Sequence, residues 1–192
     1  MPHDFRVSPS EPTQHLLDEY LDDRGVIAAA GYRLRRRRSD AAGLVYTLKS
    51  TGPASDGALF ERTEIEAAAE HDESIPAVMT AALSHAGVDV ARVLERLQLS
   101  LLLRQERHPS TLFWREEPLA LLSVDEVRAS APALGAEHQW TELEIEFLPT
   151  VTAADRTLTT QSLNEWLSEQ DGVSAAEETK PERAARLLGI AI

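Results

Sequence analysis

The sequence predicts an α+β protein that is mainly an antiparallel β-sheet, with helices covering parts of one face. Several stretches alternate polar and apolar residues with period two, which is typical of strands, and others place apolar residues at helical spacing. Turn-forming segments at 39–43 and 50–53 separate the first strands. A length of 192 residues suffices for one sizeable core, and we expect a single domain over residues 1–192.

The chain is acidic, with 19 Lys and Arg against 32 Asp and Glu and a net charge of −13. This balance argues against a general nucleic-acid or anionic-membrane binder, which needs a basic surface. Without cysteine there is no disulfide, thiolate nucleophile or Cys-ligated zinc. Residues 1–11 do not resemble a signal peptide, and no run approaches the roughly 20 apolar residues of a membrane span. We therefore expect a cytoplasmic protein.

An arginine-rich strand is predicted over residues 32–38, which contain five arginines. In an extended chain Arg33, Arg35 and Arg37 share one face, about 7 Å apart, and they repel one another unless an anion lies among them. The next predicted strand, 44–49, places Lys49 on one face. The two strands together predict a basic surface inside an acidic protein.

Acidic faces are predicted on two further strands. Arg62, Glu64 and Glu66 alternate with apolar or small residues in one of them. In a late strand, the side chains of Glu142, Glu144 and Glu146 face one way and those of Leu143, Ile145 and Phe147 the other. We expect these charged faces, with the arginines, to line the interior of one strongly curved sheet or barrel.

Helices are predicted between and after the strands. Residues 75–97 carry apolar side chains at helical spacing, and Gly87 with the N-cap candidate Asp89 divides them in two. Residues 163–167 mark an amphipathic helix that ends near Gly172. The segment 161–192 is thus expected to form C-terminal helices.

The last of these helices begins with a capping-box spacing, Thr179 and Glu182. Lys180 stands between them. From this pattern alone we interpret it as a solvated lysine at a helix start.

Charged interior faces of this kind suit a polyphosphate bound together with a divalent metal. Guanidinium and ammonium groups bind phosphate oxygens, and clustered carboxylates hold Mg²⁺ or Mn²⁺. Two alternatives need no ligand: a solvated strand face, or a sheet crossed by salt bridges.

The order and spacing of several segments also carry a family resemblance: 14–23, 31–37, 46–49, 62–66, 104–107, 123–125, 140–146 and 179–180. Together they resemble the CYTH domain of the triphosphate tunnel metalloenzymes. That resemblance implies an eight-stranded antiparallel β-barrel, open as a tunnel, with helices packed outside. It also implies Mg²⁺ or Mn²⁺ as cofactor and a triphosphate-containing small molecule or inorganic polyphosphate as ligand. A 5′-triphosphate end is the only nucleic-acid ligand expected, no membrane partner is expected, and a homodimer is kept open.

By this resemblance, phosphate is contacted by Arg35, Arg37, Lys49, Arg62, Arg104, Arg107 and Lys180. Metal is bound by Glu64, Glu66, Asp125, Glu142 and Glu144. No catalytic residue is assigned.

The chain departs from the family pattern at its start. The family's first strand reads Glu-x-Glu-x-Lys, whereas the divergent strand region 1–13 offers at most Asp4 and Arg6 in its place. Losing two carboxylates weakens metal binding more than phosphate binding, because the arginines are kept. The leading interpretation is a metal-dependent triphosphatase with weak or absent turnover, and an adenylate cyclase is a weaker one. The alternative is a non-catalytic module that binds a phosphate ligand.

Overall fold

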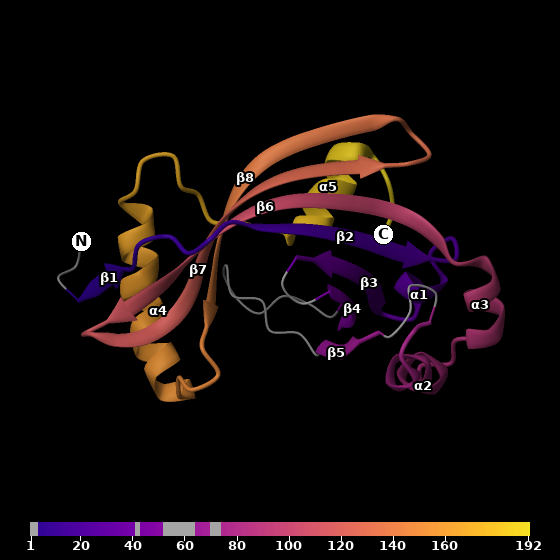
Figure 1. Cartoon of the computed structure of the whole chain (residues 1–192), viewed down its shortest axis with the longest axis horizontal. Helices are drawn as coiled ribbons and strands as arrows, with labels where there is room; N and C mark the ends of the chain where they lie inside the picture. Colours follow the sequence, from indigo (N-terminus) through magenta and orange to yellow (C-terminus); the bar gives the residue numbers. More distant parts are fainter. Residues whose placement is uncertain (1–3, 41–42, 52–63, 70–73) are drawn as a thin grey trace. The chain divides into compact units, whose positions relative to one another are not determined.

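The computed structural model describes residues 4–40, 43–51, 64–69 and 74–192 (Figure 1). The strands in this part of the chain are β1 Phe5–Val7, β2 Gln14–Asp22, β3 Tyr32–Ser39, β4 Gly43–Ser50, β5 Glu64–Ala68, β6 Gln98–Trp114, β7 Glu117–Ala131 and β8 Ala136–Phe147. The helices are α1 Val26–Ala29, α2 Ala77–His85, α3 Val90–Arg96, α4 Ala153–Ser168 and α5 Lys180–Leu188.

The strands form one eight-stranded, mainly antiparallel sheet in the order β5-β4-β3-β2-β6-β7-β8, with β1 paired to β6. Within the described residues the path has two ends, β5 and β8, so the sheet is not a closed barrel. The predicted α+β fold with eight strands and outer helices is confirmed, with an open sheet in place of a closed barrel. The strand predicted in the region 1–13 is the three-residue β1.

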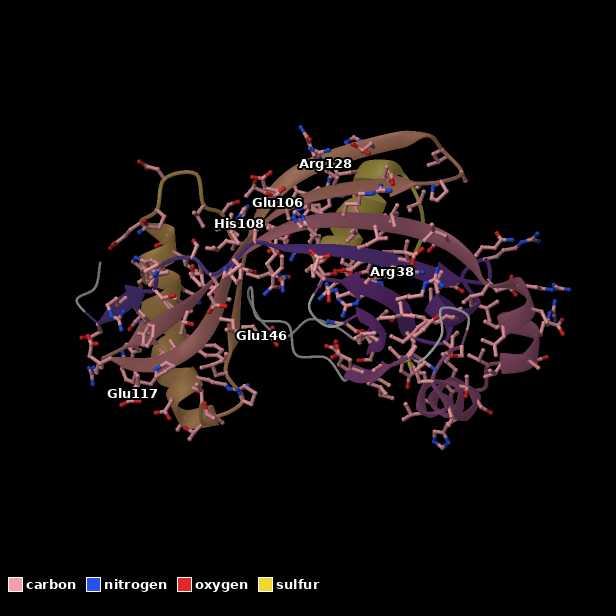
Figure 2. All side chains as sticks on the ribbon, viewed as in Figure 1. Arg38, Glu106, His108, Glu117, Arg128 and Glu146 are labelled. Carbon is pink, nitrogen blue, oxygen red and sulfur yellow. The ribbon has the colours of Figure 1, made fainter. Side chains whose placement is uncertain are left out.

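The chain divides into two compact units. Unit 1 comprises residues 1–14, 106–126 and 141–176, and unit 2 comprises 15–105, 127–140 and 177–192. The long strands β6, β7 and β8 contribute residues to both. Charged side chains are exposed in each, as at Glu117 of unit 1 and Arg128 of unit 2 (Figure 2).

Unit 2 has apolar cores on both faces of its strands. On one face Leu34 of β3 and Leu48 of β4 lie opposite each other in register, and both are buried against Met79 of α2 and Val93 of α3. This face carries the apolar alternates of the arginine strand, as the period-two pattern predicts. The other core joins strands β2, β6 and β7 to α5, and its buried members are Tyr20, Leu101, Leu103, Val127, Ala129, Ala131, Ala184 and Leu188.

Unit 1 is built around α4 and the ends of the long strands. Phe5 of β1 stacks on Trp166 of α4 with ring centroids 6.0 Å apart. Leu143, Ile145 and Phe147 of β8 pack on the same core, so the apolar alternates of the late strand point inward as predicted.

Local signals place the helices. Asp89 caps α3 by accepting a hydrogen bond from the Arg92 amide, and α2 ends just before Gly87, whose φ of 83° favours glycine. Thr179 and Glu182 form the capping box that was predicted for α5. Among the described residues no single helix is both long and apolar enough to cross a membrane, although the bent pair α2–α3 meets the length and composition criteria when its two helices are counted together.

Candidate functional site

Alternate arginines of β3 lie on opposite faces of unit 2. Arg36 donates from Nε and Nη2 to the Glu19 carboxylate at 2.8 and 3.1 Å. Arg35 and Arg37 point to the other side, toward Asp18 of the neighbouring strand. The face that holds Arg33, Arg35 and Arg37 is called the polar face of unit 2 below.

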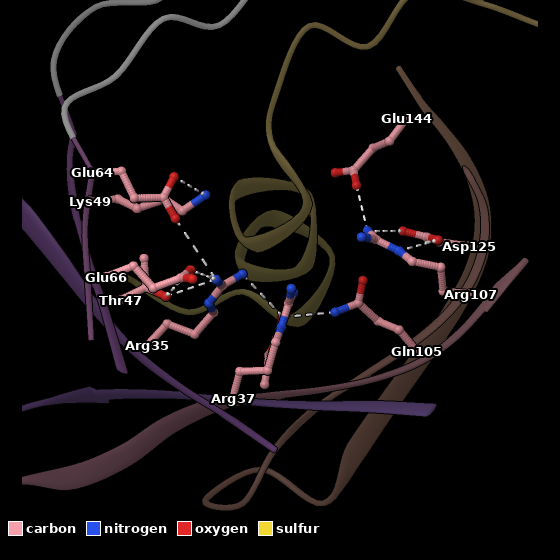
Figure 3. Close-up of polar contacts among 11 residues, drawn as sticks. Arg35, Arg37, Thr47, Lys49, Glu64, Glu66, Gln105, Arg107, Asp125 and Glu144 are labelled. Atoms are coloured by element: carbon pink, nitrogen blue, oxygen red, sulfur yellow. Dashed lines mark hydrogen bonds and ion pairs between the residues drawn. The ribbon is translucent and has the colours of Figure 1, made fainter. Parts of the chain in front are cut away.

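Asp18 is the anion around which this face is organised, and two of its partners, Arg37 and Gln105, are labelled in Figure 3. Its residue is 1% exposed. The carboxylate accepts hydrogen bonds from Arg37 Nε at 2.6 Å, Arg37 Nη2 at 2.7 Å and Gln105 Nε2 at 2.7 Å. Burial by itself raises the pKa of Asp18, but the hydrogen bonds from Arg37 and the charges of Arg35, Arg37 and Lys180 hold the pKa below its ordinary value. These partners therefore favour the charged form of the buried Asp18 carboxylate.

Arg35 is less completely paired than Arg37. Its side chain is 10% exposed and its Nη2 donates to the buried Thr47 hydroxyl at 2.8 Å. Three carboxylates stand around it beyond hydrogen-bond range: Asp18 at 3.7 Å, Glu64 at 3.9 Å and Glu66 at 4.0 Å. Within the described part of the chain its buried Nε has no hydrogen-bond acceptor. A buried donor without an acceptor is costly, so Arg35 favours an additional anionic oxygen.

The neighbouring strands bring a second cation and two carboxylates. Lys49 of β4 lies directly opposite Glu64 of β5, and Lys49 Nζ is 3.0 Å from a Glu64 carboxylate oxygen. Thr47 is opposite Glu66 and donates to it at 3.5 Å. Unlike Asp18, these two glutamates are accessible: their side chains are 37% and 58% exposed.

Helix α5 adds charge to the same face. Arg33 Nη2 donates to Glu182 at 3.0 Å, and the capping box anchors that carboxylate to the Thr179 amide and hydroxyl. Burial raises the pKa of Glu182, but the bonds from Thr179 and the charge and bond of Arg33 outweigh it and bring the pKa to about 2. Lys180 is buried with 7% exposure, so the interpretation of a solvated lysine is wrong.

A separate arginine–carboxylate group lies in unit 1. Arg107 of β6 donates from Nε to Asp125 at 2.9 Å and from Nη2 to the other Asp125 oxygen at 2.7 Å. The same Nη2 donates to Glu144 of β8 at 2.6 Å. The Asp125 side chain is fully buried. This bidentate pairing leaves the guanidinium held by two carboxylates.

The predicted site residues thus fall into several groups. Arg35, Arg37 and Lys49 share the polar face of unit 2 with Glu64 and Glu66, whereas Asp125 and Glu144 pair with Arg107 in unit 1. Glu142 is half-buried on β8, two residues before Glu144, and Lys180 is buried at the start of α5. Arg104 is exposed, and its position in β6 points its side chain away from the face that holds Gln105. Arg62 lies outside the described residues.

Sequence reasoning missed the buried groups that organise the polar face, namely Asp18, Thr47 and Gln105, and it assigned Glu182 only a capping role. The sequence does contain a signal for Gln105. It follows the apolar Leu101 and Leu103 at a spacing of two residues, on the same buried side of β6. A buried polar residue at such a position needs a partner, and Asp18 is that partner.

The candidate metal ligands do not come together as a preformed site. Among the residues that the structure describes, no three His, Cys, Asp or Glu side chains cluster to hold an ion. Glu64 and Glu66 are near Lys49 and Arg35, and Asp125 and Glu144 are bonded to Arg107. Carboxylates already neutralised by cations fit a resident divalent metal poorly.

Comparison with solved structures identifies the fold. HpAC1 from Hippeastrum, a candidate adenylyl cyclase described as having a dominant triphosphatase activity, aligns with a TM-score of 0.64 over 95% of this chain and 86% of its own, at 19% sequence identity. The chain has a CYTH-like fold. A second protein, PH1819 from Pyrococcus horikoshii OT3, aligns with a TM-score of 0.54 over 96% of this chain and 89% of its own, at 17% identity. No family model and no curated protein matches the sequence, so the CYTH-like fold rests on structure.

Proposed function

We propose that the polar face of unit 2 binds the triphosphate group of a small molecule or an inorganic polyphosphate. The observation that carries the proposal is Arg35, a buried guanidinium whose Nε lacks an acceptor in the described chain and whose surrounding carboxylates all stand at 3.7 Å or more. A phosphate oxygen supplies the missing acceptor and a charge-assisted bond. Lys49 on the adjacent strand offers a second, more accessible cation.

Hydrolysis of the bound triphosphate is the activity that we propose with this binding. It is supported by the CYTH-like fold and by the triphosphatase activity described for HpAC1. In such a reaction water attacks the terminal phosphorus, the bridging P–O bond breaks, and the shortened phosphate chain leaves with the bond's electron pair. Cations on the polar face would hold and neutralise the phosphate oxygens.

A resident Mg²⁺ or Mn²⁺ has no place in this proposal. The described carboxylates do not converge on a common point, and those nearest the cations of unit 2 are their counter-charges. Mg²⁺ or Mn²⁺ as cofactor remains a prediction of the family resemblance.

A second candidate function is binding without turnover. It is favoured by the absence, among the described residues, of any cluster of carboxylates able to hold an ion. It is also favoured by the first strand β1, which lacks the Glu-x-Glu-x-Lys pattern of the family. Arg6 of this strand lies over the Phe113 ring, 4.1 Å from its centroid, and contacts Glu116 at 3.5 Å. In this candidate function the chain senses or carries a phosphate ligand.

Two measurements on the purified chain separate these functions. Calorimetric titration with tripolyphosphate, ATP and orthophosphate, each with and without Mg²⁺, should show preference for the longer phosphate chains. Phosphate release from tripolyphosphate then tests hydrolysis. Binding with release supports the triphosphatase, binding without release supports the non-catalytic module, and no preference for longer chains contradicts both.

A further inference from the structure

Two glutamates on β5 occupy the positions next to the cations of the polar face. In the β4–β5 register Glu64 is opposite Lys49, and Glu66 is opposite Thr47. Thr47 also accepts the hydrogen bond of Arg35. Each glutamate therefore occupies a position from which an anionic ligand would contact Lys49 or Arg35.

These contacts differ from those of the buried carboxylate. Asp18 is held by three hydrogen bonds of 2.6–2.7 Å and is almost fully buried. Glu64 and Glu66 approach Arg35 only to 3.9 and 4.0 Å, and both side chains are more than a third exposed. Exposed ion pairs contribute little and exchange readily with water. Asp18 is therefore a fixed part of the site, whereas the two glutamates can move into solvent.

We propose that Glu64 and Glu66 act as internal competitors that lower the affinity of the polar face for its phosphate ligand. This inference rests on the proposed triphosphate binding and adds a limit on its strength. An incoming anion must displace both carboxylates from Lys49 and Arg35. The two glutamates therefore oppose the binding of any anion, with or without a metal present.

The competing carboxylates act on both cations together. Arg35 is opposite Thr47 in the β3–β4 register, two residues from Lys49, so the two cations are diagonal neighbours. Side chains in that relation start about 7–8 Å apart. Their charged ends nevertheless share one carboxylate, because Glu64 is 3.0 Å from Lys49 Nζ and 3.9 Å from Arg35 Nη2. A phosphate group that contacts both cations must therefore displace Glu64, and Glu66 also opposes its contact with Arg35.

The sign of the mutational effect separates this role from metal binding. Neutralising a metal ligand weakens metal-dependent phosphate binding, whereas neutralising a competitor strengthens binding without metal. The variants are Glu64→Gln, Glu66→Gln and the double variant, titrated with tripolyphosphate and with orthophosphate in metal-free buffer. Glu19→Gln is the matched control, because it removes one negative charge from the opposite face, where Glu19 pairs with Arg36.

We expect each single variant to bind tripolyphosphate about 2- to 5-fold more tightly than the wild type, and the double variant on the order of tenfold. Orthophosphate should also bind more tightly to all three variants, while Glu19→Gln leaves both affinities unchanged. Urea unfolding of the same variants verifies that they fold.

If the glutamate variants bind tripolyphosphate more weakly than the wild type or equally well, the inference is wrong. The proposed function still stands in that case, provided that Arg35→Gln binds tripolyphosphate more weakly than the wild type. Weakening seen only with Mg²⁺ also overturns it, in favour of metal ligation. If neither the wild type nor any variant binds tripolyphosphate, the proposed function fails together with the inference.

Discussion

Arg35 in unit 2 and Arg107 in unit 1 are both strand arginines surrounded by carboxylates, yet their pairing differs. Arg107 makes three hydrogen bonds of 2.6–2.9 Å to Asp125 and Glu144. Within the described residues Arg35 makes one, to the neutral Thr47 hydroxyl, and the carboxylates around it stand at 3.7–4.0 Å.

The difference shows that the number of nearby charges does not identify a ligand site. What matters is whether the donors of the cation are already satisfied. Arg107 is bound bidentately by a fully buried aspartate, and a ligand gains little by replacing it. Arg35 keeps an unsatisfied buried donor in the described chain, so an added anion improves its pairing.

The largest effect on stability is expected at Asp18. Asp18→Ala removes the carboxylate that holds Arg37, Gln105 and the charge of Arg35, and leaves buried cations uncompensated. We expect the free energy of unfolding to fall by about 3 kcal/mol or more, measured by urea denaturation. Glu19→Ala on the opposite face should cost clearly less, because the Glu19 side chain is 14% exposed against 2% for Asp18. Equal losses in the two variants would contradict the central role of Asp18.

Ligand binding should depend most on Arg35. Arg35→Gln removes the incompletely paired guanidinium and should weaken tripolyphosphate binding by about 1.5–3 kcal/mol, the range of a hydrogen bond to a charged group. Arg36→Gln is the matched control: it removes the same charge one residue away on the other face and should change the calorimetric affinity little. An equal loss of tripolyphosphate affinity in both variants would show that only the net charge of the protein matters.

Acid stability should report the bond between α5 and the arginine strand. The pKa of Glu182 is about 2 in the folded chain against an ordinary value of 4.5. Its carboxylate therefore stabilises the fold fully above about pH 4.5, and that contribution is lost as the pH falls toward 2. Glu182→Gln should lower the free energy of unfolding by about 1 kcal/mol at neutral pH, in the range of a lost cap or hydrogen bond. As the pH falls from 4.5 toward 2, this free energy should decrease less in the variant than in the wild type.

The control for this pH dependence is Glu95→Gln, which changes an exposed glutamate on α3. It should follow the wild-type acid profile in denaturation experiments at several pH values. If Glu182→Gln follows it as well, the Glu182 carboxylate does not couple α5 to Arg33.

The smallest effect on binding is expected at Arg107. Because its fork is occupied by Asp125 and Glu144, Arg107→Gln should change tripolyphosphate affinity less than twofold, well below the effect of Arg35→Gln, while lowering stability. Calorimetry and urea unfolding on the same protein measure both quantities. A binding loss as large as that of Arg35→Gln would show that Arg107 contacts phosphate, as the family resemblance implies.

Much of the fold could be predicted from local signals. Period-two alternation assigned Arg35 and Arg36 to opposite faces of a strand, because successive side chains of an extended backbone point to opposite sides. Capping chemistry placed the start of α3 at Asp89 and that of α5 at Thr179, because a cap involves only residues within one helical turn. These features are properties of short segments, so the sequence by itself determined them.

Pairing between distant segments was decided only by the tertiary structure. Gln105 meets Asp18 across 87 positions of the chain, and Arg33 meets Glu182 across 149. The carboxylate that pairs with each arginine is set by the register of β2, β3 and β6 and by the position at which α5 packs. The composition alone does not select a partner among the 32 acidic residues. The burial of Lys180 has the same origin: its exposure depends on the surface that α5 covers, and no local pattern encodes that surface.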